Sequence, residues 1–360
     1  MLEPKQKVVL GLSGGVDSAV AARLLQERGF EVFALHLITT QTPSTPPENA
    51  SPPIPAATPK IASAPPSSAV EDARKTAQAL GIPFAAINIS RELEEQVCAP
   101  FVASYLRGET PNPCIFCNPK VKFKTLIDYA DNIGAYYVAT GHYARAIDGG
   151  LYKAKSLKDQ SYMLNRLTPD QVARAIFPLG DLEKTQVRAL AENWNLPPAN
   201  KPDSMEICFI PDGDFGAYIE RRGVYFPPGN VVSKTGETLG KHRGVHRYTI
   251  GQRRGLGIAA GGRLFVCEIR PGTNEVVLSD GADLLTNEAL ARDVNWLVPC
   301  CEPFEADVKI RHSKTQTPAL VTPTPEGAKI AFKTPVRAPT RGQSAVFYVA
   351  SRLIGGGFID

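Results

Sequence analysis

The residues best suited to chemistry lie near the start of the chain, in the stretch Gly-Leu-Ser-Gly-Gly-Val-Asp-Ser at positions 11–18. An apolar run precedes this stretch and an amphipathic run, with Val16 and Val20 four residues apart, follows it, which predicts a strand, a glycine turn and a helix. Glycine permits positive φ and a close approach of the backbone to a ligand, and the first N–H groups of a helix lack intrahelical partners. With the hydroxyls of Ser13 and Ser18, these groups predict a site for a multiply charged oxyanion such as pyrophosphate.

The residue order separates this phosphate site from the commoner ones. A P-loop ends in Gly-Lys-Ser/Thr and a dinucleotide fingerprint reads Gly-x-Gly-x-x-Gly, and neither occurs here, which argues against kinases, GTPases and dehydrogenases. The pattern Ser-Gly-Gly-x-Asp-Ser resembles the PP-loop of the N-type ATP pyrophosphatases, which split ATP between the α and β phosphates and adenylate an oxygen. That resemblance implies ATP as a ligand and Mg²⁺ held with the help of Asp17. The residues that would bind ATP are Gly11, Leu12, Ser13, Gly14, Gly15, Val16, Asp17 and Ser18.

Cysteines are the second group of candidates. Cys114 and Cys117 lie three residues apart, in a segment that we expect to be a loop closing the helix that ends at Arg107. Such a spacing fits a redox pair, half of a metal site, or a nucleophile with a helper thiol. The chain has no second Cys-x-x-Cys, so an ordinary four-ligand zinc site is not expected. Cys208 follows an Asp-Ser turn that begins at Asp203, and taken alone it would be interpreted as a buried core thiol.

The composition is that of an ordinary water-soluble protein with room for two or three domains. Of its 360 residues, 43% are hydrophobic and 21% are charged, and the net charge of +4 permits a nucleic-acid partner without requiring one. No apolar run approaches the roughly 20 residues of a membrane span and the N-terminus lacks a signal-peptide pattern, so we expect a cytoplasmic protein without a membrane partner. Seven cysteines, an odd number, indicate reduced thiols, metal binding or catalysis rather than a disulfide framework.

Helical and strand patterns alternate through the first half of the chain, which predicts a parallel sheet with phosphate-binding loops at the carboxyl ends of its strands. Strands are expected at 31–38, 84–89 and 136–140, helices at 70–80, 91–107, 120–132 and within 178–195, and a hairpin at 144–147 and 152–155. Between residues 39 and 69 Pro, Ser, Thr and Ala dominate, and this insert is predicted to be disordered.

From about Pro227 onward, short alternating strands separated by Gly, Pro and Asn predict a β-barrel or a sandwich. The three glycines at 355–357 are expected to form a turn. The fold class is therefore α/β, with a doubly wound parallel-sheet PP-loop domain followed by a small central domain and a C-terminal β-barrel. We place the PP-loop domain with its insert at residues 1–200, the central domain at 201–265 and the barrel at 266–360.

Taken together, the motifs resemble those of the tRNA-specific 2-thiouridylases, which put sulfur on the wobble uridine of certain tRNAs. Besides the PP-loop, the matching stretches are Asn-Pro-Cys-x-x-Cys-Asn at 112–118, Ala-Thr-Gly-His-Tyr-Ala at 139–144, Lys-Asp-Gln-Ser-Tyr at 158–162, Asp-Ser-x-x-Ile-Cys-Phe at 203–209 and Tyr-Thr-Ile-Gly-Gln-Arg-Arg-Gly-Leu-Gly at 248–257. The resemblance covers the chain from Val8 to its end, apart from the proline-rich insert.

This resemblance implies an ATP-dependent 2-thiolation of the wobble uridine through an adenylated intermediate and a cysteine-borne persulfide. Cys208 would carry the persulfide, and Cys117 would resolve it and leave a Cys117–Cys208 disulfide to be reduced. The partners implied are tRNA and a cysteine desulfurase or sulfur-relay protein as the persulfide donor, and the enzyme is expected to act as a monomer. Leu37 and Gly141 would line the adenine pocket. The residues that would contact tRNA are Asn112, Pro113, Cys114, His142, Lys158, Asp159, Gln160, Arg311, His312 and Gln343.

Two alternatives use part of the same features. Many members of the family carry aspartate where this chain has Cys114, and Cys114, Cys117 and Cys208 together could instead hold an iron–sulfur cluster that serves the same thiolation. We favour the persulfide pair over this cluster. A PP-loop ligase that forms amides would use the loop but would leave the thiols idle. The remaining cysteines are interpreted as structural, and these are Cys98, Cys267, Cys300 and Cys301.

Overall fold

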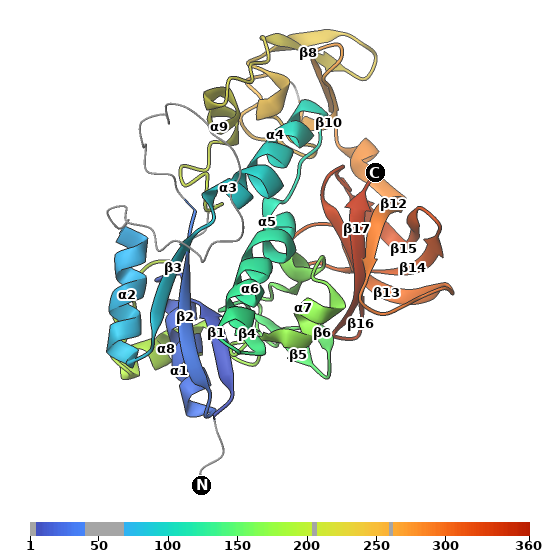
Figure 1. Ribbon diagram of the computed structural model, residues 1–360. Coiled ribbons are helices and arrows are strands. Elements are labelled where there is room, and N and C mark those ends of the chain that lie inside the picture. The colour runs from blue at the N-terminus through green and yellow to red at the C-terminus, as the bar shows by residue number, and fades with distance from the viewer. Residues whose placement is uncertain (1–4, 40–67, 204–206, 259–261) are drawn as a thin grey trace, which may run out of the picture. The chain divides into compact units, whose positions relative to one another are not determined.

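The computed structural model describes residues 5–39, 68–203, 207–258 and 262–360, which divide into two compact units (Figure 1). The first unit comprises the chain up to Gln96 and Cys117–Phe209, and the second comprises Val97–Phe116 and Ile210–Asp360. Most of the insert predicted at 39–69 lies outside the described residues, and its last two positions already belong to a helix that begins at Ser68. Within the described ranges, no helix has the length and apolar character required to cross a membrane.

The first unit is built around a parallel sheet of five strands in the order β3-β2-β1-β4-β7. These strands are β1 (Lys7–Gly11), β2 (Glu31–Ile38), β3 (Phe84–Asn88), β4 (Tyr137–Ala139) and β7 (Ala175–Ile176). Since β1 pairs with β2 on one side and with β4 on the other, the strand order reverses at β1. In open α/β sheets, ligands bind beyond the carboxyl ends of the strands at such a reversal, which is where the PP-loop follows Gly11.

Helices cover both faces of this sheet. Val8, Val9 and Leu10 are fully buried, as expected for a strand whose successive side chains meet a covering layer on either side. Val8 and Leu10 share one core with helices α1, α2 and α8, whereas Leu126 of α6 lies beside Gly11. The helices are α1 (Val16–Glu27), α2 (Ser68–Leu80), α6 (Lys124–Asn132) and α8 (Lys184–Asn193).

The other elements of the first unit largely follow the sequence pattern. They are α3 (Ser90–Leu93), the π-helix η2 (Asn118–Phe123), β5 (Ala144–Ile147), β6 (Gly150–Lys153), the 3₁₀ helix η3 (Ser161–Leu164) and α7 (Pro169–Arg174). The helix predicted at 91–107 is present as α3, the π-helical turn η1 (Glu94–Cys98) and α4 (Ala99–Leu106). The second hairpin strand lies two residues earlier than predicted, because Asp148 and Gly149 both adopt positive φ and make a two-residue turn.

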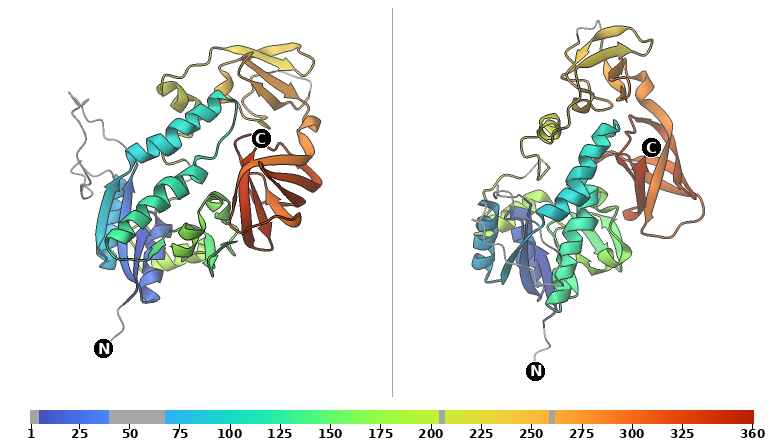
Figure 2. Two further views of the ribbon diagram at one scale, coloured as in Figure 1. Left: turned by 45° about the vertical axis from the view of Figure 1, so that its right-hand side comes forward. Right: turned by 45° about the horizontal axis from the view of Figure 1, so that its top comes forward.

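The second unit contains α4, α9 (Phe215–Arg221) and two β structures. A four-stranded sheet has the order β10-β11-β8-β9, with β8 (Gly229–Ser233), β9 (Thr238–His242), β10 (Phe265–Arg270) and β11 (Glu275–Ser279). Six further strands, drawn in orange to red in Figure 2, have the order β12-β15-β14-β13-β16-β17, and β12 also pairs with β17 to close a barrel. Their bounds are β12 (Leu285–Trp296), β13 (Phe304–Lys309), β14 (Thr317–Thr324), β15 (Gly327–Arg337), β16 (Ser344–Val349) and β17 (Arg352–Ile359).

Glycines make the closure of this barrel possible. The glycines predicted to form a turn at 355–357 lie inside β17, so that prediction is wrong. A Cβ atom at Gly357 would lie 2.7 Å from the carbonyl oxygen of Arg292, and one at Gly355 would lie 2.8 Å from that of Asn295. Both acceptors belong to β12, so only residues without a side chain allow the two strands to approach this closely.

Candidate active site

The PP-loop presents two hydroxyls at the N-terminus of α1. Ser13 Oγ and Ser18 Oγ lie 3.1 Å apart, as the spacing predicts. The N–H of Gly15 donates to Ser13 Oγ at 3.4 Å, and the Ser18 hydroxyl donates to the carbonyl of Gly15 at 3.0 Å. The turn is therefore held by its own side chains, with its hydroxyls beside the unpaired N–H groups of the first helical turn.

Two glycines let other segments pack directly on the loop. Gly14 has φ of +80°, and a Cβ there would lie 2.9 Å from the carbonyl oxygen of Ala69 in α2. Gly141 follows β4, and its Cβ would lie 3.0 Å from the backbone of both Asp17 and Ser18. The sequence assigned Gly141 to an adenine pocket, and the structure places it against the backbone of the PP-loop. Leu37, the other residue assigned to that pocket, is partly buried on β2.

Asp17 is bound by groups from distant parts of the first unit. Lys184 Nζ donates to its Oδ1 at 2.6 Å, Lys158 Nζ to its Oδ2 at 3.2 Å, and the Tyr143 hydroxyl to its Oδ1 at 2.9 Å. Lys158 Nζ also lies 5.1 Å from the centre of the Tyr143 ring. Burial, followed by the neighbouring carboxylate of Asp17, raises the pKa of Tyr143, so its hydroxyl stays protonated and continues to donate.

The same two lysines hold a second carboxylate, that of Asp203. Lys158 Nζ lies 2.9 Å from its Oδ2, Lys184 Nζ 2.8 Å from its Oδ1, and Arg188 Nη2 2.7 Å from its Oδ1. Burial alone would raise the pKa of Asp203, but the hydrogen bonds from Lys184 and Lys158 outweigh burial and lower it to about 2. Asp203 is therefore ionised throughout the neutral range. Three cations and two carboxylates thus form one connected network beside the PP-loop.

Lys201 attaches the start of the Asp203 segment to the loop itself. Its Nζ donates to the carbonyl of Gly14 at 3.2 Å and to Asp72 Oδ2 at 2.8 Å. On the other side of the loop, His36 Nδ1 lies 2.8 Å from the carbonyl oxygen of Leu12. Burial, and to a lesser extent Lys201, lowers the pKa of His36. This histidine is therefore neutral, and its Nδ1–H donates a hydrogen bond to that carbonyl.

Cys114 and Cys117 are both partly buried. The segment of Cys114 and Cys117, predicted as a loop, is instead the short helix α5 (Pro113–Cys117). The reason is local, because Asn112 Oδ1 accepts the N–H of Cys114 at 3.2 Å and Pro113 occupies the first helical position. Cys208 is exposed rather than buried. Among the residues that the structure describes, no group of three or more His, Cys, Asp or Glu side chains could hold a metal ion.

The cysteines interpreted as structural have different environments. Cys98 is buried in η1, and Cys267 lies on β10, where burial raises the pKa of its thiol. Cys300 is partly buried, and Cys301 is exposed.

Several side chains assigned to tRNA contact in the first unit bind the protein itself. Gln160 Oε1 accepts the N–H of Tyr143 at 3.0 Å. Asp159 accepts the N–H of Ala154 at 3.0 Å and the Ser161 hydroxyl at 3.0 Å. His142 Nδ1 lies 2.7 Å from Thr140 Oγ1, and burial lowers the pKa of this histidine well below its usual value. Lys158 belongs to the network around Asp17.

In the second unit, two of the assigned side chains support neighbouring backbone. Arg311 Nη2 donates to the carbonyls of Arg337 and Ala338. Gln343 Nε2 donates to the carbonyl of Thr110 at 2.6 Å, just before Asn112 and the helix α5. His312 is exposed and Pro113 is buried.

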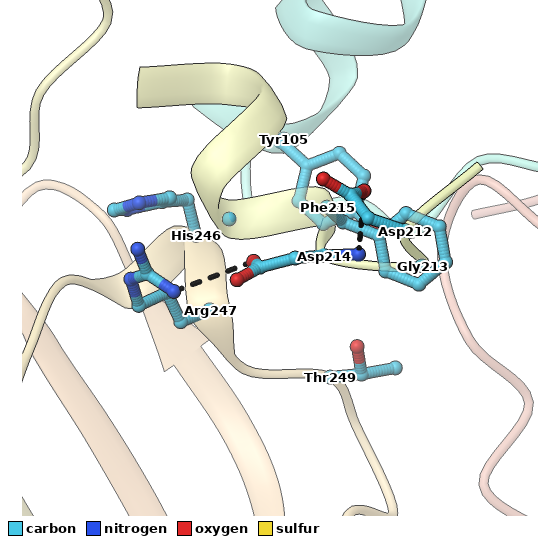
Figure 3. Close-up of a pocket in the computed structure, with 9 residues that line it drawn as sticks. Tyr105, Asp212, Gly213, Asp214, Phe215, His246, Arg247 and Thr249 are labelled. Carbon is cyan, nitrogen blue, oxygen red and sulfur yellow. Dashed lines mark hydrogen bonds and ion pairs between the residues drawn. The ribbon is translucent and has the colours of Figure 1, made fainter. Parts of the chain in front are cut away.

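The second unit also contains a separate cavity of about 340 Å³, beside the start of α9 (Figure 3). Part of its polar lining is paired, since Asp214 Oδ1 accepts the N–H of Ala217 at 2.8 Å and lies 3.5 Å from Arg247 Nη1. Arg247 also binds Glu220, and this hydrogen bond, outweighing burial, lowers the pKa of that carboxyl.

Sequence reasoning missed Tyr143, which donates to Asp17, and three members of the network, namely Asp203, Lys184 and Arg188. One signal for the last two was present, because Lys184 and Arg188 lie four residues apart and so share a face of α8. Lys184 also occupies the first turn of that helix, where the helix dipole disfavours a cation unless anions lie nearby.

Three family domains match the sequence. The tRNA methyl transferase HUP domain matches residues 6–212, the tRNA methyl transferase PRC-barrel domain matches 218–280, and the aminomethyltransferase beta-barrel domain matches 286–359. These matches confirm the predicted fold class of a parallel-sheet domain, a central domain and a C-terminal barrel.

Curated relatives match the chain over its whole length. The tRNA-specific 2-thiouridylase MnmA 1 of Clostridium botulinum (strain Loch Maree) is 44% identical over 368 residues, which cover 99% of each chain. The tRNA-specific 2-thiouridylase MnmA of Carboxydothermus hydrogenoformans is 42% identical and covers 99% of this chain and 98% of its own. A solved 4-thiouridine synthetase–RNA complex with bound ATP is 18% identical, covers 60% of this chain and 50% of its own, and has a TM-score of 0.36, too low to compare the folds.

Proposed function

This chain belongs to the family of the tRNA-specific 2-thiouridylases, and on that basis we propose that it uses ATP to replace the C2 oxygen of a tRNA wobble uridine with sulfur. It is an enzyme, a tRNA-uridine 2-sulfurtransferase. The observation that carries the proposal is that Lys158 and Lys184 both contact Asp17, a residue of the same PP-loop that carries the paired hydroxyls of Ser13 and Ser18.

The first step of the proposal is adenylation. The uridine O2 attacks the α-phosphorus of ATP, the bond to the bridging oxygen breaks, and pyrophosphate leaves. The PP-loop N–H groups, Ser13 and Ser18 would bind the departing pyrophosphate, and nearby cations would neutralise the charge that develops on it. This step is needed because the C2 oxygen of uridine is a poor leaving group, whereas AMP is a good one.

The second step is sulfur transfer. The terminal sulfur of a persulfide on Cys208 attacks C2, and the bond between C2 and the adenylated oxygen breaks to release AMP. The Cys117 thiolate then attacks Cys208 Sγ, which breaks the S–S bond and leaves the sulfur on the base. The resulting Cys117–Cys208 disulfide takes two electrons from an external thiol reductant. A cysteine desulfurase or sulfur-relay protein supplies each new persulfide.

Mg²⁺ and an iron–sulfur cluster differ in how well the described residues could bind them. Mg²⁺ commonly binds through one or two carboxylates and the phosphates of a substrate, and Asp17 can supply one such carboxylate beside the loop. The iron–sulfur alternative needs three thiolates together, and the described residues contain no group of three such ligands. We route no step of the proposed reaction through a cluster.

The tRNA side of the proposal rests on the nature of the reaction. A wobble base lies in a single-stranded loop, where turning it out of its stack costs little. Of the assigned residues, Asn112 and Cys114 at the start of α5 and the exposed His312 would approach RNA. Gln343 and Arg311 would act through the backbone segments they hold. The cytoplasmic location and the monomeric state expected from the sequence remain part of this proposal.

The proposal is tested by separating its two steps. Cys208→Ser should retain tRNA-dependent pyrophosphate release but form no 2-thiouridine, measured by a coupled phosphate assay and by nucleoside mass spectrometry. Cys301→Ser is the matched control, since Cys301 is also exposed, and it should thiolate normally. Thiolation by Cys208→Ser would contradict the sulfur step. Absence of tRNA-dependent pyrophosphate release from wild-type enzyme would contradict adenylation.

A further inference from the structure

The cations beside the PP-loop are supplied by other segments. Residues 11–18 contain no lysine or arginine, so the loop offers hydroxyls and N–H groups but no positive charge to a polyphosphate. Lys158, Lys184 and Arg188 supply that charge from two segments of the first unit far along the chain. Lys158 and Lys184 contact Asp17, which lies between Ser13 and Ser18 in the sequence, in the first turn of α1.

These three cations already form ion pairs with carboxylates of the protein. Each lysine bridges the carboxylates of Asp17 and Asp203, and Arg188 pairs with Asp203. The three cations and two carboxylates of this network together carry a net charge of +1. The side chains of Lys184 and Asp203 are 19% and 25% exposed, so much of this interaction is shielded from solvent and from salt. A pyrophosphate group with several negative charges would compete with both carboxylates for these cations.

We propose that Asp203 is a built-in counter-anion, whose carboxylate holds Lys158 and Lys184 until the phosphates of ATP take its place. This inference rests on the proposed function, since it assumes that ATP binds at the PP-loop. Asp17 belongs to the loop itself and can remain near a bound metal, whereas the carboxylate of Asp203 comes from a separate segment and meets Asp17 through these lysines. Asp203 is therefore the carboxylate that the phosphates displace.

Competition for shared cations has a reciprocal consequence. The favourable interaction free energy between Asp203 and the lysines is lost when a polyphosphate binds. Removing the Asp203 carboxylate should therefore strengthen polyphosphate binding. Asp203 thus influences both the affinity of the enzyme for ATP and the rate at which the enzyme releases pyrophosphate. Lys184 has the opposite role, because it contributes a cation that the phosphates use.

The test measures the binding of inorganic pyrophosphate to full-length protein by calorimetry, in EDTA so that no metal contributes. Asp203→Asn should tighten pyrophosphate binding by about tenfold, and Lys184→Met should weaken it by a similar factor. Asp181→Asn is the matched control, because Asp181 also pairs with a lysine, Lys155, at 3.0 Å in the same unit. It should bind pyrophosphate as the wild type does.

A measurement on wild-type protein covers the case in which Asp203→Asn does not fold. At fixed pH, the carboxyl ¹³C resonance of Asp203 should move when pyrophosphate is added, and that of Asp181 should not. An unmoved Asp203 resonance, or unchanged or weaker pyrophosphate binding by Asp203→Asn, would overturn the counter-anion role while the proposed function stands. If the wild-type enzyme bound neither pyrophosphate nor ATP, the proposed function would fail with it.

Discussion

Replacing Asp203 with asparagine should lower the stability of the first unit in a pH-dependent way. The pKa of Asp203 falls from its usual 3.8 to about 2 in the folded protein. A shift of about 1.8 pKa units corresponds to about 2.4 kcal/mol. Because the side chain is 25% exposed, screening by solvent reduces this contribution to roughly 1–2 kcal/mol.

The direction of the pH dependence follows from the lowered pKa. A carboxyl with a depressed folded-state pKa stabilises the protein fully above its unfolded-state pKa and loses this effect as the pH falls through its folded-state pKa. The difference between wild type and Asp203→Asn should therefore be constant from pH 7 to about pH 5. At pH 3 about half of it should remain.

Tryptophan fluorescence provides the assay, because the two tryptophans report on different units. Trp194 belongs to the first unit and Trp296 to the second, so a Trp296→Phe background leaves one reporter of the unit that contains Asp203. The free energy of unfolding is then measured by urea titration at pH 7 and pH 3. Asp181→Asn serves as the control and should cost under about 0.5 kcal/mol, as expected for an exposed ion pair. The reasoning would be refuted if both variants lost the same free energy of unfolding. It would also be refuted if the loss for Asp203→Asn were as large at pH 3 as at pH 7.

Three further predictions concern Gly14, Gly357 and Cys114. Gly14→Ala should abolish tRNA-dependent pyrophosphate release, because its Cβ meets the backbone of α2, whereas Gly29→Ala, with φ of +86° but open space around it, should lose only about 1 kcal/mol of stability and keep its activity. Cys114→Asp should still form 2-thiouridine in a mass-spectrometric assay, and loss of product together with loss of bound iron would instead favour the cluster. Gly357→Ala should open the barrel seam and lower its urea midpoint, while Gly272→Ala, which has no neighbour within 4 Å, should not.

Local patterns were sufficient to predict most of the elements. The strand predicted at 31–38 has those bounds in the structure, because its apolar run lies in a sheet covered on both faces. The helix α5 was missed because its start depends on one cap and one proline within a stretch that otherwise looks like a turn. The glycines at 355–357 were mistaken for a turn, since glycine marks both turns and places of close backbone approach.

The candidate site could be predicted only in part. The PP-loop is a continuous motif, so its residues can be identified directly from the sequence. The network is different, because Lys184 reaches Asp17 across 167 positions of the chain, and Lys184 and Arg188 each look like an ordinary solvated charge in the sequence. Lys184 and Arg188 come next to the PP-loop because α8 packs in one core with α1. The domain boundaries at 200 and 265 and the catalytic roles of Cys117 and Cys208 remain predictions.

The closure of the barrel by β12 and β17 has a consequence for how the protein folds. The pairs β13–β14, β14–β15 and β16–β17 join neighbours in sequence and can form early, but the β12–β17 seam joins the two strands farthest apart among the six. Long-range strand pairing is slow because a large loop must close first. Until it closes, both strands expose free hydrogen-bonding edges, and the glycines of β17 leave that edge without bulky side chains to block a foreign strand. Newly made chains should therefore be most prone to aggregate just before this seam forms, which makes the barrel's last step the one where folding assistance matters most.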